Sequence, residues 1–114
     1  MLKTNNLLEN VLIDIDKYLY DGINAHILAK KNSLSEGHLR RLFRYSFKQT
    51  ITNYIRSRKL KASLDDLLKS NSNVLDIALK YDFEYEQSFI RAFKREFGIT
   101  PGDFRKLNEQ YSIK

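Results

Sequence analysis

The chain has 114 residues, 42% of them hydrophobic, and carries a formal net charge of +6 at pH 7, so it can bury a core and favours a polyanionic partner. Its length allows one compact domain or two very small lobes that share an element. With no cysteine and two histidines, it lacks a disulfide framework and nearly all the ligands of a metal site, so we expect neither a metal nor a cofactor.

The first part of the chain predicts two helices. Apolar residues at three- and four-residue spacing predict a helix from about Leu7 to Tyr20, which Asp21 and Gly22 end. Asn24 is suited to cap a second, shorter helix, because its side chain can accept a backbone N–H. That helix carries three apolar residues, Ile27, Leu28 and Ala29.

Two further helices are predicted before the middle of the chain. Ser35 is expected to cap the first of them, whose inward side is Leu39, Leu42 and Phe43. Thr50 is expected to cap a long helix that runs through Lys69. Together with the preceding helices, this organisation predicts a first lobe over about 7–50 and a linker helix over about 51–69.

The second part repeats the pattern after a break at residues 71–73. Asn73 is expected to cap a short helix, Val74 to Lys80, and a further helix runs from about Glu86 to Phe97 until Gly98 stops it. Thr100 and Pro101 start the last helix. The sequence thus predicts an all-α fold in which a second lobe, about 73–107, completes a single 1–114 domain.

An internal repeat gives the clearest indication of function. Residues 28–44 and 77–94 each read as helix, tight turn and helix, with a small residue, Ala29 or Ala78, where the two helices would cross. The turn usually needs one residue at positive φ, a role open to Asn32 or Ser33 in the first copy and to Asp82 in the second. Two helix-turn-helix units on a basic chain indicate DNA binding.

The second helix of each repeat would read the DNA with its open side. Arginine can bind guanine and glutamine can pair with adenine, while a first-turn acid such as Glu36 either reads cytosine or complements the helix dipole. The predicted base-reading residues are Glu36, Gly37, Arg40, Arg41, Gln87, Ser88 and Arg91. The predicted phosphate contacts are Arg44, Lys48, Thr50, Arg56, Lys94, Arg95 and Arg105.

Two other charged residues are given non-reading roles. We expect Arg58 to form a structural ion pair with an acid such as Asp65 or Asp66. His38 is open to two roles, a phosphate contact or local packing and capping.

Several motifs resemble the AraC/XylS family of bacterial transcription regulators. They are residues 54–59 (YIRSRK), 76–78 (DIA), 87–94 (QSFIRAFK) and 97–105 (FGITPGDFR), and the similarity covers about Leu7 to Lys106. The resemblance implies seven helices in two homeodomain-like helix-turn-helix lobes, with both recognition helices in successive major grooves. It also implies that RNA polymerase is a partner. The sequence departs from the family pattern at Gly37, at Asp82, where glycine is usual, and at Tyr85, where a capping serine is common.

Other classes of function are weaker. No Gly-rich phosphate loop and no nucleophile or metal motif accompanies the two histidines, so we do not expect an enzyme. A helical protein-interaction module with an acidic partner would explain the charge but not the repeat. No apolar run approaches the length of a membrane span, so we expect a cytoplasmic protein that associates with the nucleoid when bound to DNA. We expect it to bind as a monomer, with reading helices about 34 Å apart.

Overall fold

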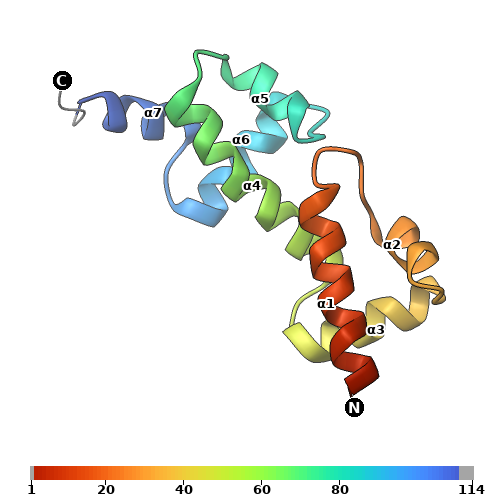
Figure 1. Cartoon of the computed structure of the whole chain (residues 1–114). Coiled ribbons are helices and arrows are strands. Elements are labelled where there is room, and N and C mark those ends of the chain that lie inside the picture. Colours follow the sequence, from red (N-terminus) through yellow and green to blue (C-terminus); the bar gives the residue numbers. More distant parts are fainter. Residues whose placement is uncertain (1, 111–114) are drawn as a thin grey trace. The chain divides into compact units, whose positions relative to one another are not determined.

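The computed structural model describes residues 2–110, and in this range the chain forms seven helices and no strand (Figure 1). They are α1 (Leu2–Lys17), α2 (Ala25–Lys31), α3 (Glu36–Phe47), α4 (Ile51–Lys69), α5 (Val74–Lys80), α6 (Glu86–Phe97) and α7 (Pro101–Gln110). The predicted all-α fold is confirmed. The chain divides into a first unit, up to Arg58, and a second unit, from Lys59 onward, so that α4 contributes to both.

The first helix lies nearer the N-terminus than predicted. It ends at Lys17, where the expected end was Tyr20. The backbone N–H of Asp21 donates to the carbonyl of Tyr18 at 3.0 Å, and Gly22 follows with φ 70°, so the chain already turns before Tyr20. Leu19 is buried in this turn. Because Leu19 is apolar and buried without being helical, the apolar pattern of the sequence extends beyond the end of the helix. The predicted end was therefore too late.

Five helices begin at a side-chain cap that the sequence predicted. In each case the cap oxygen accepts the backbone N–H three residues further on, at 2.8–3.1 Å, which satisfies one of the N–H groups left free at a helix start. The capping residues are Asn24, Ser35, Thr50, Asn73 and Thr100. Tyr85, before α6, makes no side-chain cap hydrogen bond, which is also as expected.

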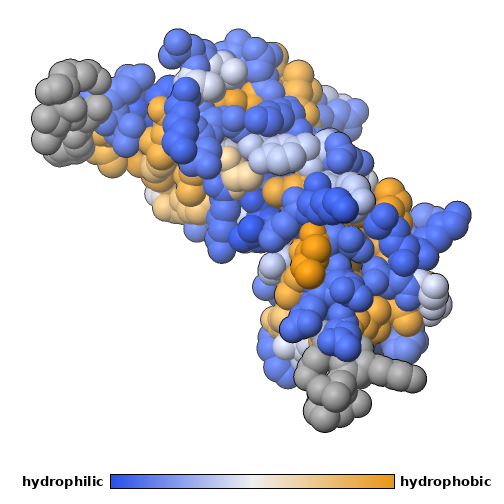
Figure 2. All heavy atoms as spheres, viewed as in Figure 1, coloured by the Kyte–Doolittle hydropathy of each residue, from blue (hydrophilic) through white to orange (hydrophobic). Residues whose placement is uncertain are grey.

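Each unit has its own apolar core. In the first unit, Phe43 is fully buried, with its ring 4.7 Å from that of Phe47 and 5.4 Å from that of Tyr54. In the second unit, Phe93 is fully buried against Phe89 and Phe97. The inward side predicted for the first recognition helix is therefore buried at Leu39 and Phe43, while much of the outer surface in view is hydrophilic (Figure 2).

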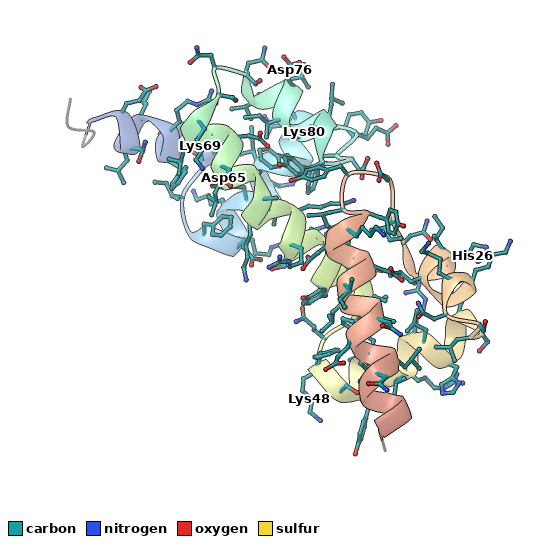
Figure 3. All side chains as sticks on the ribbon, in the orientation of Figure 1. His26, Lys48, Asp65, Lys69, Asp76 and Lys80 are labelled. Carbon is teal, nitrogen blue, oxygen red and sulfur yellow. The ribbon has the colours of Figure 1, made fainter. Side chains whose placement is uncertain are left out.

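The predicted partner of Arg58 is wrong. Its Nε donates to Oδ1 of Asp16 on α1 at 3.0 Å, within the first unit. Asp65 and Asp66 lie two turns along α4 from Arg58, roughly 10 Å away by helix geometry, and have other partners. Asp65 pairs with Lys69 at 3.7 Å, two residues labelled in Figure 3. Asp66 accepts from Lys80 at 3.0 Å and from the hydroxyl of Tyr81.

No helix within residues 2–110 combines the length and the apolar character needed to cross a bilayer.

Candidate nucleic-acid interface

The same helix-turn-helix geometry occurs once in each unit. Between α2 and α3, the N–H of Leu34 donates to the carbonyl of Ala29 at 2.9 Å, around Ser33 at φ 58°. Between α5 and α6, the N–H of Phe83 donates to the carbonyl of Ala78 at 3.0 Å, around Asp82 at φ 70°. Both are Schellman-type helix ends with one left-handed residue. Of the two candidates in the first turn, Ser33 adopts the positive φ, and Asp82 does so as predicted.

Small residues allow the helices of each motif to approach. Ala29 on α2 and Ala78 on α5 are buried, with 2% and 0% of their surface exposed. A larger side chain at either crossing would push the recognition helix away from its support. The two alanines therefore fix how far α3 and α6 stand out from their units.

The recognition helix of the first unit has an apolar inner side and a basic outer side. Leu39 and Phe43 are fully buried, whereas Gly37, Arg40 and Arg41 are exposed. Arg40, Arg41 and Arg44 line an open pocket of about 240 Å³ together with Thr50 and Ile51, at the start of α4. Three arginine side chains beside the start of α4 make this face of the first unit positively charged, which favours an anion such as a DNA phosphate.

The second recognition helix has the same division. Phe89 and Phe93 are fully buried, while Gln87 and Arg91 are exposed and Ser88 is half-buried. Each unit thus brings its predicted base-reading residues together on one side of one helix.

Glu36 links both helices of the first motif. Its Oε2 accepts from Nε of Arg40 at 3.0 Å and lies 2.9 Å from Nη2 of the same residue. Its Oε1 lies 3.5 Å from Nδ1 of His26 on α2, a residue labelled in Figure 3. The hydrogen bond from Arg40 lowers the pKa of the Glu36 carboxyl below its usual value. The four-residue spacing of Glu36 and Arg40 could have revealed their pair, but no local signal connects His26 to them.

The predicted phosphate contacts other than Arg105 are exposed or half-exposed. Lys48 ends α3 in a left-handed conformation that the sequence did not indicate, with φ 60°, and its Nζ lies 5.1 Å from the ring centre of Tyr45. The hydroxyl oxygen of Thr50 caps α4 while its surface is half-exposed. The remaining basic side chains of this set are exposed, namely Arg44, Arg56, Lys94 and Arg95.

Arg105 has a different position from the other phosphate candidates. Its guanidinium donates to the carbonyls of Leu67 at 3.1 Å, Ser70 at 3.2 Å and Asp66 at 3.4 Å, at the end of α4. The carbonyl of Asp66 also accepts from the backbone N–H and the hydroxyl of Ser70, so the guanidinium chiefly serves the carbonyls of Leu67 and Ser70. Arg105 is thus engaged in closing the C-terminal end of α4, a role that no pattern near residue 105 could have indicated.

Known proteins are similar to this chain in sequence and in fold. A family profile described as "Helix-turn-helix domain" matches residues 28–107. Regulatory protein SoxS of Escherichia coli (strain K12) is 32% identical over 99 residues, which cover 87% of this chain and 92% of SoxS.

Two solved structures have the same fold. An AraC-type transcriptional regulator from Chromobacterium violaceum superposes with a TM-score of 0.86 at 18% identity and covers 98% of this chain and 100% of its own. The DNA-binding domain of AdpA, solved in complex with a target DNA, has a TM-score of 0.81 at 18% identity. The match covers 90% of this chain and 93% of the AdpA chain.

The family match gives no support to a protein-interaction module as the primary function. Two helix-turn-helix motifs, an exposed basic recognition helix and similarity over most of the chain lead to one assignment. The chain belongs to the AraC/XylS family of helix-turn-helix, DNA-binding transcription regulators.

Proposed function

We propose that the chain reads double-stranded DNA with both α3 and α6, each in one of two successive major grooves. The observation that carries this proposal is the repeated motif, in which each unit buries one side of its recognition helix and exposes the other. In α3 the reading residues are Arg40 and Arg41, beside the small Gly37. In α6 they are Gln87, Ser88 and Arg91, whose side chains can form hydrogen bonds with base edges.

Phosphate contacts position these helices. The pocket beside Arg44 and Thr50 accepts one phosphate, and Lys48 and Arg56 lie on the same unit. Lys94 and Arg95, in the last turn of α6, serve the second unit. Arg105 is left out of this set because its guanidinium is bonded to the end of α4.

The family membership supports the remaining parts of the proposal. The chain acts by binding and not by catalysis, engages its site as a monomer and contacts RNA polymerase at the promoters it controls. It does so in the bacterial cytoplasm, as part of the nucleoid while bound. An asymmetric site, without two-fold symmetry, follows from monomer binding with two different reading helices.

Selection from a random DNA library, followed by a salt series, tests the proposal. We expect one enriched, non-palindromic sequence and a steep fall of log K with log[salt], with a slope of about −0.9 for each phosphate contact. Arg44→Gln should reduce that slope by about one unit, while Lys106→Gln, an exposed cation on α7 outside the proposed contacts, should leave it unchanged. A flat salt dependence, or no enriched sequence, would contradict DNA reading.

A further inference from the structure

We infer that Glu36 is a positioning residue, which holds the guanidinium of Arg40 so that it presents one edge to the DNA and selects guanine. This inference rests on the proposed function and assigns Glu36 a role other than reading cytosine itself. It follows from how the hydrogen-bonding groups of the two residues are distributed.

The pair leaves Arg40 a defined set of free donors. Arginine has five N–H groups, and Glu36 Oε2 lies 3.0 Å from Nε and 2.9 Å from Nη2 of Arg40. The side edge of the guanidinium is therefore occupied, and the end edge, formed by Nη1 and the second N–H of Nη2, is left. Two parallel donors match the O6 and N7 acceptors of guanine in the major groove. Adenine offers a donor in place of O6, so the same edge is a poor match for it.

The carboxylate itself is confined from two sides. Arg40 occupies Oε2 from within α3, and His26 approaches Oε1 from α2. A cytosine N4 group would have to compete with both. Glu36 is also the first residue of α3, directly after the Ser35 cap, where its charge complements the helix dipole.

The position of the pair explains why a weak interaction in the free protein matters on DNA. The side chains of Glu36 and Arg40 are 40% and 47% exposed, and such surface pairs contribute little to folding. In a major groove the water around them is displaced and the local dielectric falls, so the same contact restrains Arg40 more strongly. A fixed arginine loses less conformational entropy when it binds than a freely rotating one.

A comparison of variants on one set of duplexes tests this role. The probe is the duplex that the wild-type chain selects from a random library. The position tested is the base pair at which Arg40→Gln loses discrimination. The duplex is remade with each of the four bases at this position and, in a further version, with 7-deazaguanine, which lacks the N7 acceptor. For Arg40→Gln we expect guanine preference at that base pair to fall by roughly 5- to 150-fold, the range of one bidentate contact. Glu36→Gln should lower the preference at the same pair by at least about threefold, because the side edge is no longer held by a charged partner. In the double variant, Glu36→Gln should cause no further loss.

Glu86→Gln is the matched control. Glu86 is the first residue of α6, as Glu36 is of α3, but the residue four positions on is Ile90, so no arginine stands where Arg40 stands. This variant removes the same first-turn charge and should leave base preference at the Arg40 position unchanged. Thermal unfolding of each variant checks that the helices are intact.

The possible outcomes separate this inference from the proposed function. If Glu36→Gln changes binding to all duplexes by the same factor, as Glu86→Gln would through the loss of one negative charge, the positioning role is wrong although DNA reading stands. The same holds if Glu36→Gln still changes base preference in the Arg40→Gln background. If the wild-type chain enriches no sequence, the proposed function fails, and this inference fails with it.

Discussion

Lys59 Nζ lies 2.8 Å from Oδ2 of Asp82, the residue with φ 70° in the second helix-turn-helix. The side chain of Lys59 is only 12% exposed and that of Asp82 is 43% exposed. The pair ties α4 to the turn that precedes α6, within one unit. Asp82 strains the backbone by adopting a positive φ, but its side chain makes a tertiary contact. Glycine, which the AraC/XylS family usually has at this position, could not make that contact.

Asp82→Gly and Asp82→Ala should separate these two contributions. Both remove the ion pair, but only alanine keeps a Cβ at positive φ, where an L-residue is strained by about 1–2 kcal/mol. Glycine has more conformational entropy in the unfolded chain, which offsets part of this difference. We therefore expect Asp82→Ala to be less stable than Asp82→Gly by up to about 1 kcal/mol. Denaturant unfolding measures the difference, and Lys59→Met should be less costly in the Asp82→Gly background than in the wild type. Equal costs in both backgrounds would show that the pair does not stabilise the turn.

The carboxyl of Glu36 should titrate below its usual pKa of 4.5, because Arg40 donates a hydrogen bond to its charged form. A carboxyl whose pKa is lower in the folded state stabilises the fold fully above the unfolded value. Its contribution is lost as pH falls through the lower, folded pKa. We expect the midpoint of its NMR titration to lie below 4.5 in the wild type and to rise in Arg40→Gln. An unchanged midpoint would contradict the pair.

Arg91 and Lys94 should have different effects on specificity. Arg91 lies exposed in the middle of α6 and is one of the proposed base readers, so Arg91→Ala should cost about 1–3 kcal/mol on the selected site and relax preference at one base pair. Lys94 lies in the last turn, and Lys94→Ala should weaken all sequences alike and reduce the salt slope by about one unit. Gel-shift titrations on selected and random duplexes measure both. Equal losses on the two duplexes for Arg91→Ala would count against base reading.

The first unit should contribute more of the affinity than the second. The arginines of α3 share one face and one pocket, whereas α6 has a single arginine among its predicted readers. With each bidentate contact worth about 1–3 kcal/mol, Arg40→Gln combined with Arg41→Gln should reduce affinity by at least about tenfold more than Arg91→Gln. The reverse order would contradict this asymmetry while leaving the fold assignment intact.

Arg105→Met should destabilise the second unit by about 2–3 kcal/mol, because its charged donors bond carbonyls of α4 that would be left without partners. Lys106→Met removes the same charge from an exposed position on α7 and should change the free energy of unfolding by less than about 0.5 kcal/mol. Comparing the two by denaturant unfolding separates a structural role from a general charge effect. Similar small effects would indicate that the end of α4 is satisfied by water.

Helix starts and inward faces were predictable because their causes are local. Asn73 and Thr100 accept an N–H three residues away, and apolar periodicity alone placed Leu39 and Phe43 in the core of the first unit. The end of α1 was misjudged because Leu19 is buried without being helical.

Long-range polar pairs were not predictable in the same way. The partner of Arg58 lies 42 positions earlier, at Asp16, whereas the acids named as examples from the sequence, Asp65 and Asp66, lie on its own helix. His26 reaches Glu36 only because the turn folds α3 back against α2. The sequence thus identified the exposed faces of α3 and α6, but not the contacts that orient the side chains on them.

The bonds from Arg105 set a limit on how far the chain can be shortened. Leu67 and Ser70 lie before the break at residues 71–73, and the donor that closes their helix comes 35 positions or more later. A fragment that stopped at Phe104 would retain all of α6 and every proposed DNA contact, yet the carbonyls of Leu67 and Ser70 would lose the guanidinium that binds them. The minimal DNA-binding fragment is therefore defined by a residue that need not touch DNA.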